Sequence, residues 1–305
     1  MDAKILGIHH VTAIAAAPQP NVDFYTGFLG MRLVKKTVNF DDPNTYHFYY
    51  GNRTGSPGSI LTFFPWPGAH RGYHGSGQVT VTSFAVPKGS IGRWRERACA
   101  HGVSTDPIMA RFDEEVLALR DPDGLQLELI GSLDAGDDDA IGKIHSATIS
   151  EEAYAETAKL LTETMGFRFT GEHHNRLRYE VAAGGPGATV DVLFTPELRQ
   201  GSGGAGTVHH IAWRTADSQQ QSLWQQYLTK LGYNVSPVMD RQYFQSIYFR
   251  EPGGVLFEIA TDSPGFTVDE PLEGLGTGLM LPPAYEKLRK QIELKLPEII
   301  VPVRI

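Results

Sequence analysis

The chain contains one structural unit four times, and this internal repeat limits its fold more than any other feature of the sequence. Each copy opens with a short β-rich run, such as IHHVTAI or VHHIAWR, and continues through a helical stretch to a glycine. Glycine at that place is typical of a helix C-cap, where the backbone is left-handed. Alternating apolar segments separated by turn residues follow, as in strands on a half-buried sheet. The copies are Ile8–Trp66, Gly77–Gly131, Lys143–Pro196 and Gly206–Asp262.

The closing hairpins show the repeat most directly. The segment RDPDGLQLE at 120–128 aligns with REPGGVLFE at 250–258, and PGSILTF at 57–63 is a weaker copy. A Pro-Gly turn between two strands accounts for each bend. Each unit is therefore a strand, a helix and three further strands. The sequence predicts an α+β fold in which four βαβββ units form two cupped mixed-sheet barrels.

An acidic stretch, Leu133–Gly142, divides the units into two pairs. The chain after the last unit contains a short helical pattern at Ala284–Leu296, and its apolar end, Leu296–Ile305, is typical of a surface that contacts a protein partner, such as a second copy in a homo-oligomer. The expected parts are a first module at 5–132, a second module at 141–262 and a C-terminal tail at 263–305.

Composition argues against several classes of function. The 305 residues carry a formal net charge of −8, which disfavours nucleic-acid and anionic-membrane partners because such binding needs clustered Lys and Arg. The single cysteine, Cys99, excludes an intramolecular disulfide and a multi-thiolate zinc site. Its apolar helical surroundings predict a buried thiol. No segment has the pattern of a signal peptide or a membrane span, so we expect a cytoplasmic protein.

Two of the opening strands carry a histidine pair, His9-His10 and His209-His210. Because neighbouring side chains in a strand point to opposite faces, we expect one histidine of each pair to point into a barrel and the other outward or into its wall. Glu258, at the end of the last hairpin, is a third ligand candidate. Two imidazoles and one carboxylate on converging strands form a facial triad with open positions on the metal. A single histidine can equally have a structural role, but three matching positions favour a metal site.

The other units lack these ligands, and this predicts how the units pair. The third unit has Ser146 and the second has Val81 where the others have their second histidine. Glu128 matches Glu258, but its barrel would hold neither histidine, so we interpret Glu128 as a structural or rim carboxylate. Phe63 stands where a fourth ligand would lie. The triad is complete only if the first and fourth units pair around the metal and leave the second and third to form a metal-free barrel.

With these features, the chain resembles the glyoxalase/bleomycin-resistance/extradiol dioxygenase (vicinal oxygen chelate) superfamily. More narrowly, it resembles hydroquinone-type ring-cleaving dioxygenases such as the 2,6-dichlorohydroquinone 1,2-dioxygenase group. The resemblance covers nearly the whole chain. Its motifs are IHHVT at 8–12, FYTGFLGMRLVKKTVNFDD at 24–42, TYHFYYGN at 45–52, PGSILTFFP at 57–65, VPKGSIGRW at 86–94, VHHIAW at 208–213, DRQYFQSIYFREPGGVLFE at 240–258 and SPGFTVDE at 263–270.

The resemblance implies one Fe(II) ion on the second histidine of each pair, His10 and His210, and on Glu258; a purified sample could also hold Mn(II) or Zn(II). The chain departs from the expected pattern at Gln242, where we expect glycine, and this predicts a changed pocket wall. The resemblance also implies outer-sphere roles around the metal for His9, Thr12, His209, Arg241 and Tyr248.

The implied activity is cleavage of a hydroquinone-type aromatic diol, with a small aromatic substrate and dioxygen as partners. Ferrous iron suits it because the ion can bind a substrate oxygen and dioxygen side by side. Protons must leave the phenol and later return, and Tyr248 and His9 are the candidates to carry them. Arg241 would stabilise an anionic intermediate or hold a ring substituent, unless it is a solvated surface arginine.

Three other interpretations stay open. A glyoxalase-like metal-dependent isomerase or lyase normally uses four protein ligands, and Phe63 removes the fourth. A catechol-type extradiol dioxygenase carries its ligands in one module, against which Ser146 argues. A non-catalytic quinone- or drug-binding protein would not need the full triad. Several ring side chains either line the pocket or belong to the core, namely Phe63, Phe244, Tyr243, Trp213, Tyr46 and His47.

Overall fold

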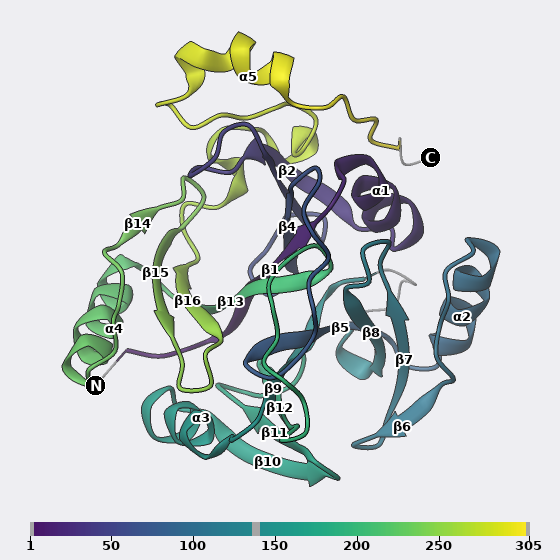
Figure 1. Cartoon of the computed structure of the whole chain (residues 1–305), viewed down its shortest axis with the longest axis vertical. Coiled ribbons are helices and arrows are strands. Elements are labelled where there is room, and N and C mark those ends of the chain that lie inside the picture. Colours follow the sequence, from purple (N-terminus) through teal and green to yellow (C-terminus); the bar gives the residue numbers. More distant parts are fainter. Residues whose placement is uncertain (1–2, 136–140, 303–305) are drawn as a thin grey trace.

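The computed structural model describes residues 3–135 and 141–302, and Figure 1 shows the chain. All four predicted units are present. The first consists of β1 (Gly7–Ala15), α1 (Pro18–Val22) continued by a π-helical turn (Asp23–Phe28), β2 (Arg32–Val38), β3 (Tyr46–Gly51) and β4 (Ile60–Pro65). The second consists of β5 (Gln78–Pro87), α2 (Ile91–Ala100), β6 (Met109–Arg111), β7 (Glu114–Arg120) and β8 (Gln126–Ser132), after which comes a 3₁₀ turn (Leu133–Ala135).

The second half of the chain repeats this order. The third unit consists of β9 (Lys143–Glu151), α3 (Ala155–Lys159) continued by a π-helical turn (Leu160–Thr164), β10 (Arg168–His173), β11 (Arg176–Glu180) and β12 (Thr189–Phe194). The fourth consists of β13 (Thr207–Thr215), α4 (Ser218–Lys230), β14 (Met239–Asp240), β15 (Gln245–Arg250) and β16 (Leu256–Thr261).

The helices end at the predicted glycines. Gly30, Gly102, Gly166 and Gly232 each lie two residues after the last residue of a helix, with φ of 67°, 68°, 79° and 91°. This left-handed conformation has little steric cost for a residue without a Cβ atom. The same turn therefore directs the chain from the helix into the second strand of each unit.

The strands form two eight-stranded mixed sheets, and each sheet takes one unit from each half of the chain. The first sheet has the order β14-β15-β16-β13-β1-β4-β3-β2, and the second has the order β10-β11-β12-β9-β5-β8-β7-β6. In Figure 1 the first sheet fills the upper left and centre, and the second lies below it and to the right. The prediction that the first and fourth units pair with each other is confirmed by the antiparallel contact of β1 with β13.

We expect residues 141–305 expressed alone to fold poorly and bind no metal. In the intact chain β13 lies between β1 and β16, so the truncated chain exposes a hydrogen-bonding edge at the centre of the sheet. It also lacks His10. Circular dichroism and elemental analysis of the purified fragment check this. A folded, iron-loaded fragment would show that the fourth unit does not depend on the first.

The core joins the two sheets and leaves the outer helix faces to solvent. Trp213 of β13 is fully buried, with its ring 5.1 Å from Phe167 of the third unit and 5.2 Å from Phe257 of β16. On α2 the buried residues are Ile91, Trp94 and Ala98, which follow helical spacing. The prediction of a buried Cys99 is wrong, because Cys99 follows Ala98 directly, lies off this apolar face and is exposed.

Two carboxyl groups meet where the second sheet contacts the β15–β16 hairpin. Glu151 ends β9 and Glu251 begins the hairpin turn, and their exposed fractions are 1% and 2%. Glu251 accepts hydrogen bonds from Thr157 Oγ1 at 2.6 Å and from the Val255 amide at 2.8 Å. The Oε1 atom of Glu151 has no partner among the described residues. Burial, with the nearby charge of Glu251, raises the pKa of Glu151 to about 8.

This pair predicts that Glu151→Gln makes stability less dependent on pH. The pKa of Glu151 is about 8 in the folded state, against an ordinary value of 4.5. Between these two pH values the folded state binds more protons than the unfolded state, so stability falls as pH rises. The stability of the variant minus that of the wild type should therefore increase with pH across this window, by at most about 1.4 kcal/mol per pH unit. Urea unfolding from pH 5 to 9 with a chelator present measures the difference. A difference that stays constant with pH contradicts the assignment.

The C-terminal segment lies against the edge of the first sheet. Leu279 pairs with Lys36 of β2, and the Met280 amide donates to the Lys36 carbonyl at 2.9 Å. Three 3₁₀ turns (Phe266–Val268, Leu272–Gly274 and Glu286–Leu288) precede α5 (Arg289–Lys295), which lies at the top of Figure 1 and agrees with the predicted short helix. The last three residues of the predicted partner surface lie outside the described residues; within it, Leu296 is buried and Ile300 is exposed.

Among the described residues, every helix is too short or too polar to cross a membrane.

Candidate metal centre

The strand register places the three predicted ligands on one face of the first sheet. Thr12 of β1 lies opposite His210 of β13, and Ala212 lies opposite both His10 and Glu258 of β16. Residues opposite each other in neighbouring strands share a face, and so do residues two apart in one strand. His10, His210 and Glu258 are buried, and their ligand atoms all lie within 4.8 Å of one another.

In each pair the first histidine turns toward the second one, which differs from strict alternation, but only His209 of the two first histidines lines the cavity. His9 Nδ1 lies 2.8 Å from His10 Nδ1, and His209 Nδ1 lies 2.8 Å from His210 Nδ1. The cause is a register shift at each pair, between Ile8 and His10 on β1 and beside His209 on β13. A β-bulge adds one residue to a strand and breaks the strict alternation of its side chains.

These contacts orient the inner imidazoles, the rings of His10 and His210, toward each other, and the rings of His9 and His209 are the outer ones. His10 Nε2 and His210 Nε2 are 3.4 Å apart. If each inner ring carries its proton on Nδ1 and donates it to the neighbouring histidine, both Nε2 lone pairs are free for a cation. The outer rings are then neutral acceptors, in agreement with the pKa values of His9 and His209, which burial lowers to about 3. Burial also lowers the pKa of His210.

Glu258 completes a set of converging lone pairs. Its Oε2 atom lies 2.9 Å from His210 Nε2 and 3.4 Å from His10 Nε2. These contacts lack hydrogen-bond geometry, so Oε2 is a buried oxygen without a hydrogen-bond partner among the described residues. Its Oε1 atom accepts from Ser246 Oγ. Burial opposes the charged form, but contacts with His10 and His210 in their protonated forms outweigh it and hold the pKa of Glu258 well below its usual range.

This donor set fits a divalent cation. Adjacent octahedral ligands at about 2.1 Å from an ion lie about 3 Å apart, and the observed separations are 2.9 to 3.4 Å. A cation between these atoms would satisfy the orphaned carboxylate oxygen and the two facing nitrogens together. Two imidazoles and one carboxylate on one side leave the other side of the ion facing the cavity.

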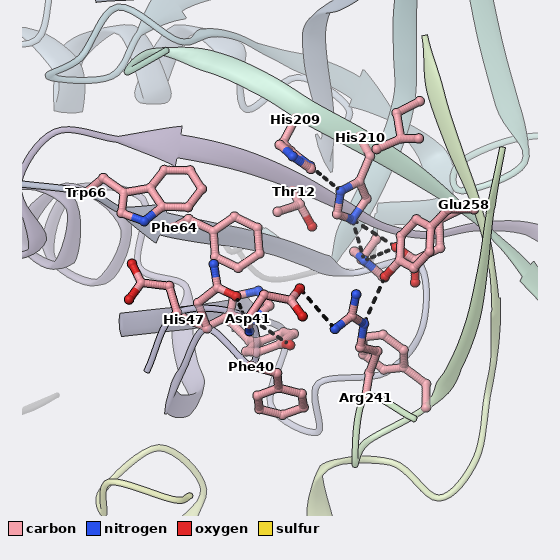
Figure 2. Close-up of a pocket in the computed structure, with 17 residues that line it drawn as sticks. Thr12, Phe40, Asp41, His47, Phe64, Trp66, His209, His210, Arg241 and Glu258 are labelled. Carbon is pink, nitrogen blue, oxygen red and sulfur yellow. Dashed lines mark hydrogen bonds and ion pairs between the residues drawn. The ribbon is translucent and has the colours of Figure 1, made fainter. Parts of the chain in front are cut away.

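A cavity of about 420 Å³ opens in front of the triad. Its walls are largely apolar and aromatic, from Phe40, Phe64, Trp66 and Phe244. Figure 2 shows Phe64, His209 and Arg241 around the space that His210 and Glu258 face. The volume lies within the usual range for small-molecule sites.

Four of the five predicted outer-sphere residues line this cavity, namely Thr12, His209, Arg241 and Tyr248. Arg241 Nε donates to Tyr248 Oη at 3.2 Å, and Nη1 lies 3.4 Å from Asp41 Oδ2. Burial and the charge of Glu258 raise the pKa of Tyr248, so its hydroxyl keeps its proton. The fifth, His9, packs behind Phe244 at 5.0 Å between ring centres.

The position of the missing fourth ligand is Thr62, and the prediction of Phe63 there is wrong. Thr62 of β4 lies opposite Thr12, as Glu258 lies opposite Ala212 in the fourth unit. Phe63 points to the other face of the strand, where its ring lies 4.6 Å from Tyr25 in the core. The weak hairpin copy at 57–63 misaligned the two units by one residue. A one-residue shift exchanges the two faces of a strand.

A hydrogen-bonded relay that the sequence did not indicate runs from Thr62 along the cavity wall. Thr62 Oγ1 donates its one proton to Thr12 Oγ1 at 3.0 Å. Thr62 must therefore be the acceptor in its 2.8 Å hydrogen bond with His47, and the proton of that bond lies on His47 Nε2. His47 Nδ1 then accepts from Tyr49 Oη at 2.9 Å. Burial lowers the pKa of His47 well below its usual range, so the ring is neutral. The Thr12 hydroxyl proton is left for an acceptor in the cavity.

The structure distinguishes the ring side chains that line the cavity from those that belong to the core. Phe244 and His47 line the cavity. Trp213 and Phe63 are core residues, and Tyr243 is buried beside the C-terminal segment. Tyr46 turns away and donates to the Pro297 carbonyl at 3.0 Å. The spacing of His47 and Tyr49, two apart in a strand, could have indicated that they share a face.

The second barrel has carboxylates at the positions that correspond to Glu258, but arginines neutralise them. Glu128 lies opposite Ser83, and Asp191 lies opposite Thr148. Arg111 donates to both oxygens of Glu128 at 2.9 and 2.6 Å, and Arg178 Nε donates to Asp191 at 2.8 Å. Such two-pronged pairs fix a carboxylate firmly. Glu128 therefore makes the structural contacts that the sequence predicts.

Comparisons with known proteins agree with this architecture. The sequence model of the Glyoxalase/Bleomycin resistance protein/Dioxygenase superfamily matches residues 7–129 and 143–259. The chain is 49% identical over 304 residues to "Putative ring-cleaving dioxygenase MhqO" of Bacillus subtilis (strain 168), with 96% of each chain covered. It is 33% identical over 309 residues to the chlorohydroquinone/hydroquinone 1,2-dioxygenase of Sphingobium indicum, again with 96% of each covered.

The crystal structure of a "putative dioxygenase from Bacillus subtilis subsp. subtilis str. 168" superimposes on this chain with a TM-score of 0.94. It shares 48% sequence identity, and the alignment covers 98% of this chain and 99% of that one. The four repeated units, their two sheets and the matches over both halves lead to one conclusion: the chain belongs to the glyoxalase/bleomycin resistance protein/dioxygenase superfamily.

Proposed function

We propose that the chain is a ring-cleaving dioxygenase that binds one Fe(II) ion through His10, His210 and Glu258 and acts on a hydroquinone-type aromatic diol. The observation that carries the proposal is the convergence of two imidazole nitrogens and an unpartnered carboxylate oxygen beside an aromatic cavity. The names of the relatives, one of which refers to hydroquinone itself, support the same class of reaction.

Fe(II) suits the site because imidazole and carboxylate ligands on one face are typical of iron that activates dioxygen. When bound, it would supply open positions for a substrate oxygen and for dioxygen, and a path for electrons between them. Thr62, at the fourth position, offers a hydroxyl that is already engaged with Thr12 and His47. This favours a three-ligand site over the four-ligand site of a glyoxalase-like isomerase.

The protein side chains would bind and orient the diol. The rings of Phe64, Trp66 and Phe244 form walls against which a flat ring packs. Arg241 stays charged at all ordinary pH values and lies against Tyr248, so the two can stabilise a phenolate oxygen by charge and by a hydrogen bond. Thr12 has a hydroxyl proton left to donate into the same space.

Proton transfer is assigned to Tyr248 at the substrate oxygen. Its hydroxyl is protonated and faces the cavity, which a proton donor requires. His9 is shielded by Phe244 and touches His10, so we assign it the role of orienting that ligand and not of carrying protons to substrate.

Oxygen uptake by protein that was purified without air and reloaded with Fe(II) tests the proposal. We expect uptake with hydroquinone that depends on iron and exceeds the uptake with catechol. A preference for catechol favours the ordinary extradiol reaction. Tight binding of hydroquinone without oxygen uptake, in iron-loaded protein, favours a non-catalytic binder.

A further inference from the structure

A lysine without exposed surface anchors the C-terminal segment to the first sheet. Lys35 of β2 forms ion pairs with Asp269 and Glu270, and its side chain is 0% exposed. Glu270 also accepts from the amides of Gly276 and Gly278, each at 3.3 Å. Burying an ammonium group is costly unless fixed partners surround it. The segment from Asp269 to Gly278 is therefore held in one position on β2.

Asp269 makes a second set of contacts, to a turn that belongs to the metal site. Its Oδ2 atom accepts from Gln242 Nε2 at 2.7 Å and from Tyr243 Oη at 3.0 Å. The ammonium group of Lys35 lies 5.0 Å from the centre of the Tyr243 ring. We call these contacts of Asp269 with Lys35, Gln242 and Tyr243 the Asp269 network.

The turn at residues 241–244 connects the cavity with Asp269: its first and last residues line the cavity, and its two central residues contact Asp269. The Tyr243 amide donates to the Arg241 carbonyl at 2.7 Å, and the Arg241 amide donates to the Phe244 carbonyl at 3.0 Å. Arg241 and Phe244 line the cavity, and the Phe244 ring lies 5.0 Å from that of His10. The positions of these two side chains therefore depend on a turn fixed through Gln242 and Tyr243.

Gln242 is the residue at which the chain departs from the expected glycine. Its φ is 64°, a conformation that glycine adopts easily and that L-residues rarely adopt. Its side chain points to Asp269 and makes a hydrogen bond to a carboxylate, one of the stronger kinds in proteins. The turn keeps the conformation suited to glycine and gains an anchor that glycine cannot provide.

We propose that Gln242 and Asp269 are positioning residues, which hold Arg241 and Phe244 where a hydroquinone-type substrate must bind. This inference rests on the proposed function, since it acts through the contact of Arg241 with the substrate. It also gives the C-terminal segment a part in the site, although the segment contributes no residue to the cavity wall among the described residues.

Gln242→Asn is the informative change. Asparagine tolerates the left-handed conformation but is one carbon shorter, so it loses the contact with Asp269. We expect kcat/KM for hydroquinone to fall about 10-fold, as for one hydrogen bond to a charged group, with iron content unchanged. Gln245→Asn, the same change at a half-buried residue of the following strand, should stay within about 2-fold of the wild type, because Gln245 does not line the cavity.

A double-mutant cycle separates positioning from general damage. In the Arg241→Ala background, Gln242→Asn should lower kcat/KM by clearly less than about 10-fold, because Phe244 is then the only one left of the two residues that Gln242 positions. Equal effects of Gln242→Asn in both backgrounds, or no effect in either, overturn the proposal.

A readout that does not depend on activity distinguishes this proposal from the proposed function. Trypsin cleaves after arginine, and anchoring of the turn should protect the Arg241–Gln242 bond. Cleavage after Arg199, an exposed residue between β12 and β13, serves as the reference. We expect Gln242→Asn to raise cleavage after Arg241 about 10-fold relative to this reference, if opening of the turn loses one charged hydrogen bond. Unchanged cleavage overturns the anchor even if the enzyme is active. Increased cleavage supports the anchor even if hydroquinone proves not to be a substrate.

Discussion

His10→Ala, His210→Ala and Glu258→Ala should each abolish iron binding and oxygen uptake. Each change removes one of three converging ligand atoms, which lie within 4.8 Å of one another. Mutation of a residue that only hydrogen-bonds to a metal ligand commonly lowers metal affinity about 10- to 100-fold. Removal of a ligand itself should therefore lower the affinity more than about 100-fold. Elemental analysis of protein reloaded with Fe(II) and then desalted measures the iron content directly.

The matched control is Glu128→Gln in the second barrel. Glu128 occupies the position that corresponds to Glu258, but it is paired with Arg111. Glutamine keeps its volume and part of its hydrogen bonding, so the fold should survive with iron near the wild-type level. His145→Ala should likewise keep its iron. Full iron in a His10, His210 or Glu258 variant, or its loss in Glu128→Gln, would refute the ligand assignment.

Tyr248→Phe should keep iron but lose most of its turnover with hydroquinone. The substitution removes a single protonated hydroxyl next to Arg241 and leaves the ring in place. Proton transfer and charge stabilisation at the reacting oxygen are worth about 10²- to 10⁴-fold in rate. The loss should appear mainly in kcat, because these interactions are strongest in the transition state. Steady-state oxygen uptake over a range of hydroquinone concentrations separates kcat from KM.

Tyr46→Phe provides the same chemical change away from the cavity. The Tyr46 hydroxyl donates to the Pro297 carbonyl, so its removal should affect stability slightly and turnover little. If Tyr248→Phe turns over at the wild-type rate, Tyr248 is not the proton donor.

The sequence was sufficient to predict the arrangement of the units. The repeat of a strand, a glycine-capped helix and a hairpin is a local pattern, and each local pattern formed the expected element. The pairing of the first and fourth units followed from chemistry, because Ser146 and Val81 leave the alternative barrel without histidines. Both inferences needed only residue types and their order.

The finer geometry of the site could not be predicted, for physical reasons. Strict alternation separates His9 from His10, but a bulge brings their Nδ1 atoms to 2.8 Å. No residue type in IHHVT marks that bulge. Thr62 and Phe63 exchange roles through a one-residue shift, which the weak hairpin copy at 57–63 did not resolve. The contact of Asp269 with Gln242 joins residues 27 positions apart through tertiary packing alone.

The measurement that tests the proposed function most directly is the stoichiometry and product of the reaction with hydroquinone. Iron-loaded enzyme should consume one dioxygen for each hydroquinone and release a ring-opened product whose mass is the sum of the two, without hydrogen peroxide. Oxygen electrode readings combined with mass spectrometry of the product give both quantities. Formation of benzoquinone with hydrogen peroxide, or recovery of unchanged hydroquinone, would contradict ring cleavage at the centre formed by His10, His210 and Glu258.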